Sequence, residues 1–221
     1  MTRQPQIDKA ELSKFYKQML QAYKINHWWP ADSVLEVAVG AILTQNTMWK
    51  NVEKAIKNLK SARALTFQRL ISLPETQLAE LIHPSGYYNI KAKRIKSLLI
   101  FLENTGGFQK LRKMDLQTAR NSLLSINGIG PETADDILLY GLNLPVFVID
   151  SYTRRILERI DLIEGNESYE QLRSMLESAL PKEANIYKKY HSVFVEHAKQ
   201  VCKKKPICEA CCLKLDCPGF S

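Results

Sequence analysis

The cysteines are the residues whose type and spacing most directly suggest chemistry. All five lie in the last twenty residues, at positions 202, 208, 211, 212 and 217. Five, two and five residues separate Cys202, Cys208, Cys211 and Cys217, a spacing that lets four thiolates reach one soft metal centre. A four-cysteine zinc site usually has two C-x2-C pairs, and only Cys208 and Cys211 have that spacing. We expect a metal site in this loop, and its spacing favours an iron–sulfur cluster over zinc.

A second pattern lies in the middle of the chain, where Gly128 and Gly130 are followed directly by Pro131. This sequence predicts a tight turn that needs two glycines, with the proline in the first turn of the next helix. The N–H groups of such a turn, together with the helix dipole, can hold a phosphate oxygen without reading bases. An ordinary helical hairpin could carry the same glycines, so the other features of the chain must decide between the two.

Asp150 follows the apolar segment 146–149 and precedes a predicted helix. Aspartate is a favoured N-cap, and the helix dipole favours its ionised form. A fixed carboxylate at the edge of a cavity can also stabilise a developing cation. We therefore expect Asp150 to cap a helix, and we regard it as a candidate catalytic residue.

The elements that must position these residues are helices. Apolar residues recur at helical spacing along most of the 221 residues, and no segment alternates like a strand, which predicts an all-α fold. Short connections containing proline or glycine separate the helices. The expected helices cover residues 12–23, 34–43, 52–59, 89–102, 116–124, 132–142, 151–160, 169–180 and 185–200.

Composition limits the class of protein. A hydrophobic content of 45% is enough for a core, and no apolar run reaches the roughly 18 residues of a membrane span. The net charge of +8 fits a polyanionic partner, although ordinary soluble proteins can also carry it. The first residues lack the apolar core of a secretory signal, so we expect a cytoplasmic protein, nucleoid-associated in a bacterium or archaeon. In that compartment metal ligands or free thiols are favoured over disulfides.

The glycine turn, the downstream Asp150 and the C-terminal four-cysteine loop together resemble the helix-hairpin-helix DNA glycosylases of the endonuclease III superfamily. The resemblance covers nearly the whole chain and implies a two-lobed, all-α fold whose cysteines hold a 4Fe–4S cluster. One departure is the first cysteine gap, which encloses five residues here and usually six in the family. The implied domains are a central helical domain, 26–144, with the hairpin at about 120–142, and a cluster domain, 1–25 plus 145–221, with its loop at 202–217.

The resemblance also implies roles for single residues. Gln45 matches the residue that fills the gap left by a flipped nucleotide, and Gly86 lies in the segment that resembles a second DNA-binding turn. Members of the family that also cleave the strand have a lysine where this chain has Glu132, and a carboxylate cannot form a Schiff base. We therefore expect a monofunctional glycosylase without AP lyase activity. Lys91 and Lys93 are the lysines that could substitute.

All three tryptophans lie in the first 49 residues, as Trp28, Trp29 and Trp49. With their surrounding segments they resemble the 3-methyladenine DNA glycosylase III branch, in which aromatic residues matching Trp28 and Trp49 sandwich the flipped base and the residue matching Glu132 lies at the pocket. A 3-alkylated purine is cationic, and indole faces attract cations. Packing in a hydrophobic core is the alternative role for each indole.

The best-known member of that branch lacks the cysteine cluster, so the loop in this chain is a second departure. Its lysines, Lys203, Lys204 and Lys205, are expected to bind DNA phosphates. We expect a monomeric base excision repair enzyme that acts on alkylated purines, such as 3-methyladenine, in damaged double-stranded DNA. The alternatives are an endonuclease III-like glycosylase for oxidised or mismatched pyrimidines and a non-catalytic protein that binds damaged DNA.

Overall fold

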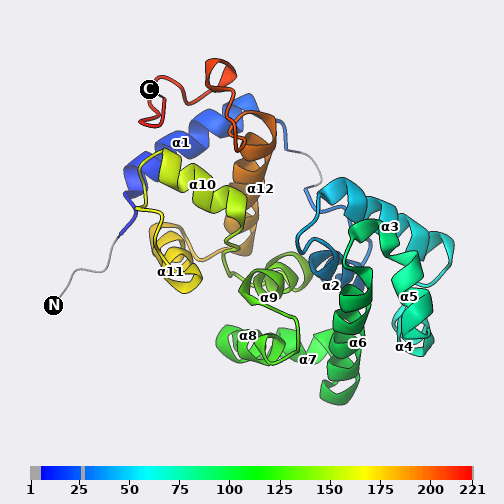
Figure 1. Ribbon diagram of the computed structural model, residues 1–221. Coiled ribbons are helices and arrows are strands. Elements are labelled where there is room, and N and C mark those ends of the chain that lie inside the picture. The colour runs from blue at the N-terminus through cyan, green and yellow to red at the C-terminus, as the bar shows by residue number, and fades with distance from the viewer. Residues whose placement is uncertain (1–5, 26–27, 221) are drawn as a thin grey trace. The chain divides into compact units, whose positions relative to one another are not determined.

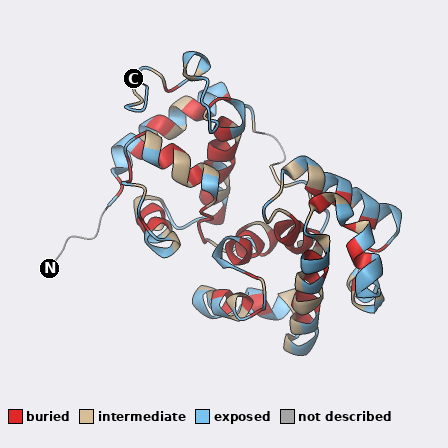
Figure 2. Cartoon of the chain, in the orientation of Figure 1, coloured by how far each residue is buried: buried red, intermediate tan, exposed pale blue. Residues whose placement is uncertain are grey.

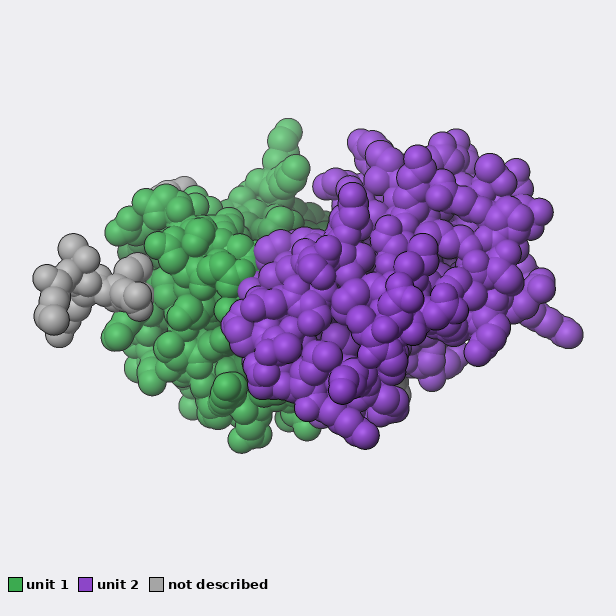
Figure 3. All heavy atoms as spheres, turned by 90° about the horizontal axis from the view of Figure 1, so that it is seen from below, with its two compact units in different colours: residues 1–28, 145–221 green, residues 29–144 purple. Residues whose placement is uncertain are grey.

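Figure 1 shows the computed structural model, which describes residues 6–25 and 28–220. The described residues form twelve α-helices and no β-strand, which confirms the all-α prediction. The chain forms two compact units, Met1–Trp28 with Pro145–Ser221, and Trp29–Leu144 (Figure 3). The sequence placed the first of these boundaries between residues 25 and 26. Within the described residues, no helix is both long and apolar enough to cross a membrane.

The unit Trp29–Leu144 is built around α2 (Val34–Leu43). Eight of the ten α2 residues are buried (Figure 2), as expected for a helix that is apolar on almost every side. It packs against four neighbouring segments of the unit. The helices that follow it are α3 (Trp49–Ser61), α4 (Phe67–Ser72), α5 (Glu75–Leu81), α6 (Tyr88–Thr105), α7 (Gly107–Lys113), α8 (Leu116–Leu124) and α9 (Pro131–Asp136).

Three of these helices, α4, α5 and α7, were not expected from the sequence. Each has only six or seven residues, too few to show a helical period clearly. Tertiary contacts stabilise them instead. The Lys96 ammonium group of α6 donates to the carbonyl groups of Leu70, Ile71 and Leu73, at 2.7, 2.8 and 2.5 Å, and so binds the end of α4.

The expected hairpin consists of α8, the connection 125–130 and α9. A buried ion pair joins its two helices, because Arg120 Nε and Nη2 donate to the two Asp135 carboxylate oxygens at 2.6 and 3.1 Å. Gly128 has a left-handed φ of +83°, whereas Gly130 has an ordinary φ of −90°. The turn therefore requires glycine for its backbone conformation only at Gly128, which corrects the prediction that both positions need it.

The helix expected over 132–142 differs in its second half. After α9 the chain continues as a π-helical segment, Ile137–Gly141, and the Leu142 N–H donates to the Ile137 carbonyl group, five residues back, at 3.0 Å. This segment packs closely on α2, where a Cβ atom at Gly141 would lie 3.2 Å from Val34 Cγ1. Helical periodicity predicts an ordinary α-helix here because one wider turn leaves the apolar pattern almost unchanged.

The unit Met1–Trp28 with Pro145–Ser221 contains α1 (Lys9–Ala22), α10 (Ser151–Arg159), α11 (Tyr169–Ala179) and α12 (Ala184–Gln200). Helix α12 packs against both α1 and α10. Tyr190 of α12 stacks on Tyr16 of α1 with ring centroids 3.8 Å apart. The C-terminal segment also contacts α1, since Asp216 accepts hydrogen bonds from Lys14 Nζ and Gln18 Nε2 at 2.5 and 2.7 Å.

Candidate functional site

Asp150 is the N-cap of α10, as the sequence predicted. Its Oδ1 accepts a hydrogen bond from the Thr153 N–H at 2.6 Å, and its Oδ2 lies 3.5 Å from His191 Nε2. Burial alone would raise the pKa of Asp150, but the His191 contact and the Thr153 N–H outweigh it and lower the pKa below the ordinary value. The side chain is 14% exposed. Asp150 is thus a fixed, ionised carboxylate that still has an accessible edge.

Trp28 lies beside His191, which faces the Asp150 carboxylate. The edge of the Trp28 ring meets the His191 ring, with centroids 6.3 Å apart and planes at 86°. The Lys199 ammonium group lies 5.0 Å from the Trp28 ring centre, within the range of a cation–π interaction. Trp28 Nε1 is buried and has no hydrogen-bond partner among the residues that the structure describes. Asp150, His191 and Trp28 therefore form one connected group within a single unit.

Trp29 and Trp49 belong to the other unit, and the structure brings these two indoles together. Their ring centroids lie 5.3 Å apart in an edge-to-face arrangement. Tyr140, from the π-helical segment, stacks on Trp29 with centroids 4.9 Å apart and planes at 27°. Tyr140 was not expected at this place from the sequence, because an α-helix over 132–142 gives no reason to single it out. The half-buried Trp49 also donates from Nε1 to Glu53 Oε1 at 3.0 Å.

Gln45 is bound to the hairpin in this structure. Its Nε2 donates to the Gly128 carbonyl group at 3.1 Å and to Thr133 Oγ1 at 2.9 Å. Its Oε1 accepts a hydrogen bond from Arg94 of α6. The Arg94 side chain also crosses Gly128 so closely that a Cβ atom there would overlap it. These contacts connect the end of α2, the hairpin turn and α6, and the role expected for Gln45 in filling a gap in a duplex would require them to break.

The remaining residues expected on the DNA side differ in exposure. Gly86 has a left-handed φ of +68°, directly before α6, and Glu132 is exposed in the first turn of α9. Lys91, in contrast, is only 1% exposed, and its Nζ donates to the carbonyl groups of Leu43 and Ser85 at 2.8 and 2.7 Å. Burial, with a smaller contribution from the charge of Arg94, lowers the pKa of Lys91 to about 8. Lys91 ties α2 to the Gly86 turn.

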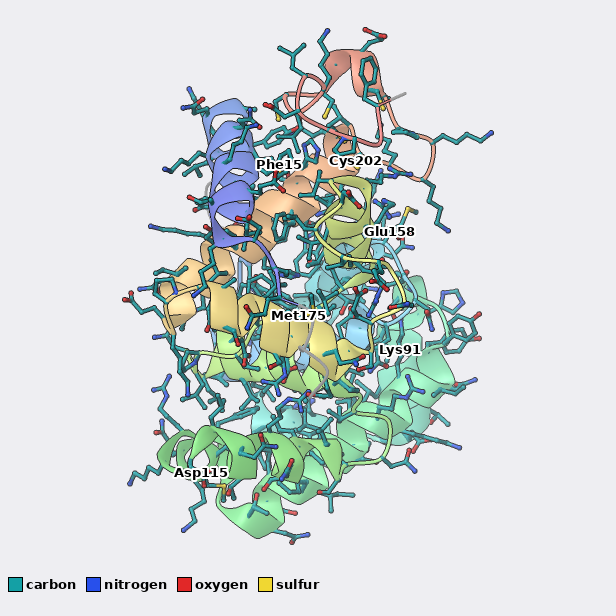
Figure 4. All side chains as sticks on the ribbon, turned by 90° about the vertical axis from the view of Figure 1, so that its left-hand side faces the viewer. Phe15, Lys91, Asp115, Glu158, Met175 and Cys202 are labelled. Atoms are coloured by element: carbon teal, nitrogen blue, oxygen red, sulfur yellow. The ribbon has the colours of Figure 1, made fainter. Side chains whose placement is uncertain are left out.

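The cysteine loop begins at Cys202, where the chain leaves α12 (Figure 4). Cys202 Sγ lies 3.3 Å from Arg159 Nη1, and Cys211 Sγ lies 3.7 Å from His197 Nε2. Burial raises the pKa of Cys217, and the neighbouring sulfur atoms of Cys202, Cys208 and Cys211 raise it further. Thiol sulfur is a donor that soft metal centres prefer.

The structure does not confirm the iron–sulfur site. In residues 6–25 and 28–220, no three or more His, Cys, Asp or Glu side chains are arranged so that they could hold a metal ion. The exposed Cys212, which lies outside the expected ligand set, has its sulfur 4.0 Å from His197 Nδ1. The 4Fe–4S cluster, like its zinc alternative, therefore stays a prediction based on the cysteine spacing.

Two arginines of α10 hold the backbone of the loop. Arg155 Nε donates to the Cys202 carbonyl group at 3.0 Å. Arg159 donates from Nη1 to the Lys203 carbonyl group at 2.6 Å and from Nη2 to that of Lys204 at 3.0 Å. The three lysines, Lys203, Lys204 and Lys205, are all exposed. A loop fixed in this way can present its ammonium groups to a polyanion with little loss of backbone entropy.

The chain is similar to a known protein family. Residues 39–182 match the model of the HhH-GPD superfamily base excision DNA repair protein. A Methanocaldococcus jannaschii protein provisionally named a DNA repair glycosylase is 47% identical over 207 residues, which are 92% of this chain and 94% of that protein.

Two solved structures are also similar. One is H. pylori 3-methyladenine DNA glycosylase bound to 1,N6-ethenoadenine, with a TM-score of 0.76 and 29% identity, covering 88% of this chain and 98% of that one. The other is a non-covalent endonuclease III–DNA complex, with a TM-score of 0.84 and 20% identity, covering 97% of each chain. At 20% identity the second likeness concerns the fold alone.

Proposed function

We propose that this protein is a monofunctional enzyme for alkylated purines such as 3-methyladenine. The chain belongs to the HhH-GPD superfamily and is a DNA glycosylase of base excision repair. The observation that carries the proposal is Asp150, a fixed and ionised carboxylate connected through His191 to Trp28. A carboxylate held in this way can stabilise positive charge on a sugar, and the nearby indole offers a surface for a base.

The proposed reaction is a hydrolysis at C1′ of the damaged nucleotide. The N-glycosidic bond breaks and its electron pair leaves with the base, so that a cationic 3-alkylpurine departs as a neutral molecule. Asp150 stabilises the oxocarbenium-like sugar that forms. A water oxygen then bonds to C1′ and its proton passes to the Asp150 carboxylate, which leaves an abasic site. Because the base already carries a positive charge, little acid catalysis is needed.

The choice of an alkylated purine is supported by the aromatic side chains and by one relative. Trp28 in one unit, and Trp29 with Trp49 in the other, are half-buried and present electron-rich rings. Lys199 near the Trp28 ring shows that a cation can occupy a place beside this indole. The 29% identical structure is that of a 3-methyladenine DNA glycosylase. We infer that the indoles stack on the flipped base, with Glu132 contacting the base or the water.

The absence of AP lyase activity is proposed from the chemistry of two positions. Glu132 stands where a lyase of this family would have its lysine, and a carboxylate cannot form a Schiff base. Lys91, one possible substitute, has its ammonium group buried between two carbonyl groups, so it would have to break both bonds to reach a sugar. Lys93, the other possible substitute, is exposed on α6.

The partner is proposed to be double-stranded DNA that contains damaged bases, bound by a monomer. The proposed contacts are those of Gly86, Gly128 and Gly130 with the backbone, Gln45 with the gap in the duplex, and Lys203, Lys204 and Lys205 with phosphates. Cys202, Cys208, Cys211 and Cys217 would hold a 4Fe–4S cluster, which when bound supplies a covalent cross-link for the C-terminal loop. Chemical analysis that finds zinc without iron and sulfide would contradict the cluster.

The decisive experiment identifies the released bases by mass spectrometry, with methylated DNA and oxidised DNA as separate substrates. We expect free 3-methyladenine from methylated DNA. Release of pyrimidine products alone would select an endonuclease III-like specificity, and release of no base would select a non-catalytic damage-binding protein. Borohydride should trap no covalent enzyme–DNA adduct, since a trapped adduct would show a Schiff base and therefore lyase chemistry.

A further inference from the structure

The two oxygen atoms of Asp150 have partners of different kinds. Oδ1 accepts from the Thr153 N–H at 2.6 Å, which is the ordinary contact of a helix N-cap. Oδ2 faces His191 Nε2 at 3.5 Å, across the α10–α12 packing. Asp8, at the start of α1, caps its helix through the N–H groups of Ala10 and Glu11. Capping therefore accounts for one oxygen of Asp150 and leaves the contact with His191 to be explained.

His191 is a buried imidazole, and a buried imidazole requires partners for its ring nitrogen atoms. It is only 5% exposed, and burying a polar ring is unfavourable unless its nitrogen atoms have partners. One ring nitrogen faces Asp150, and the ring also meets the edge of Trp28. A single side chain thus contacts both the proposed catalytic carboxylate and one of the proposed base-stacking indoles.

We propose that His191 is a positioning residue, whose Nε2 faces Asp150 Oδ2 at 3.5 Å and orients the carboxylate while its ring supports Trp28. The inference rests on the proposed function, because His191 acts through Asp150 and not on the DNA. With Oδ1 bound by the Thr153 N–H and Oδ2 facing His191, rotation of the carboxylate about its Cβ–Cγ bond is restrained. The negative charge of Asp150 is then already oriented before the sugar becomes cationic, and such preorganisation is what electrostatic stabilisation of a transition state requires.

The electrostatics agree with this role. His191 works against burial in setting the low pKa of Asp150, with help from Thr153 of the same helix. His191 of α12 is the titratable group that faces Asp150 across the helix packing, and Lys199 of α12 lies beside Trp28. Without the imidazole, the pKa of the carboxyl group should be higher than in the wild type, because only the Thr153 hydrogen bonds would still oppose burial. The acid limb of the rate profile should then move to higher pH.

Two substitutions separate positioning from packing. In His191→Gln the amide nitrogen lies where Nε2 lies in histidine, whereas in His191→Asn it lies near the place of Nδ1, too short to reach Asp150. Ser192→Ala serves as the matched control, because Ser192 is buried on the same helix and its hydroxyl donates to the Lys189 carbonyl group at 2.9 Å. All three variants keep similar or smaller volume, and circular dichroism checks their folding.

The measurement is the single-turnover rate of base release from a duplex that the wild-type protein cleaves, with binding measured on the same duplex carrying a tetrahydrofuran abasic analogue. We expect His191→Asn to be slower by roughly 10- to 100-fold and His191→Gln by about threefold, the scale on which a misplaced group lowers a rate. Binding should change by about twofold or less in both, since His191 makes no proposed DNA contact. Ser192→Ala should match the wild type.

Three outcomes would overturn the inference: wild-type rates in both His191 variants, equal slowing of the two, or a loss of binding that accounts for the slower rate. If one variant fails to fold, the other still tests the inference. The inference requires slow base release by folded His191→Asn and near-normal base release by folded His191→Gln. The test is separate from that of the proposed function. Full activity of Asp150→Asn would remove the role of Asp150 itself, whereas an inactive Asp150→Asn with a fully active His191→Asn would remove only the positioning role.

Discussion

The starts of α10 and α9 carry two different kinds of group. At α10 a charged side chain, Asp150, caps the helix and is held on its second oxygen by His191. At α9 the N-cap is Gly130, which has no side chain, and the preceding turn is shaped by the left-handed Gly128. A fixed negative charge stabilises the positive charge that develops on the sugar during a reaction, whereas backbone N–H groups donate equally weak hydrogen bonds at every stage. The first region should therefore control the rate of base release and the second the affinity for DNA.

Asp150→Asn gives the largest effect and tests the first half of this comparison. Asparagine caps helices as well as aspartate does, so the fold should persist while the negative charge is lost. We expect the single-turnover rate to fall by roughly 10²- to 10⁴-fold with binding to an abasic-analogue duplex retained. Asp8→Asn at the cap of α1 is the control and should keep the wild-type rate. An Asp150→Asn enzyme with normal activity would end the catalytic assignment.

The pH dependence sharpens the same point. Because the folded-state pKa of Asp150 is lowered, the carboxylate stays ionised as the pH falls toward and below the ordinary value of about 3.9. The stability that this carboxylate adds is present above that value and is lost as the pH falls through the lowered pKa. Base-release rates measured between neutral pH and about pH 5 should show no decline from this group. A limb near neutral pH that vanishes in Asp150→Asn would contradict the lowered pKa.

Arg120→Met tests what supports the second region. The Arg120–Asp135 pair joins α8 to α9, and its side chains are only 4% and 0% exposed. Removing the arginine takes from Asp135 the buried guanidinium group that neutralises its charge, so the free energy of unfolding should fall by roughly 3–5 kcal/mol. Urea denaturation measures the change. Asp32→Asn is the comparison, because Asp32 is 87% exposed in its pair with Lys60 and its loss should cost about 1 kcal/mol or less.

Several features of both regions could be predicted from the sequence. The cap role of Asp150 follows from a polar residue between an apolar segment and a helix, and the turn follows from Gly128 before Pro131. Long amphipathic helices such as α12 were also expected, because their apolar positions repeat over several turns. These are local signals, carried by residues that are neighbours along the chain.

What could not be predicted depends on contacts between distant residues. His191 lies 41 residues after Asp150, and one histidine in a helix carries no pattern that identifies its partner. Tyr140 stacks on Trp29 through a π-helical turn that periodicity does not reveal. Arg94 crosses Gly128 from another helix. The sequence therefore predicts the candidate functional residues better than it predicts the residues that hold them in place.

Gly128→Ala probes the hairpin directly. Gly128 has a φ of +83°, and a Cβ atom would overlap the Arg94 side chain, so the alanine variant must distort the turn. We expect weaker binding to every duplex, by roughly tenfold, with the single-turnover rate at saturating enzyme preserved. Gly130→Ala should lower the affinity for DNA less, because the φ of −90° at Gly130 suits alanine and the space around it is open. A reduced rate at saturation would break the division between the two regions.

The cysteine loop tests whether that division follows the two units or the chemistry of each residue. Lys203, Lys204 and Lys205 belong to the same unit as Asp150, yet as exposed lysines they should act on affinity. Replacing all three with alanine should lower the slope of log affinity against log salt by about 1 for each lysine. A triple alanine variant of Lys110, Arg112 and Lys113 in α7 removes the same charge elsewhere. Equal slopes in the two variants would show that total charge, and not the fixed loop, sets the salt dependence.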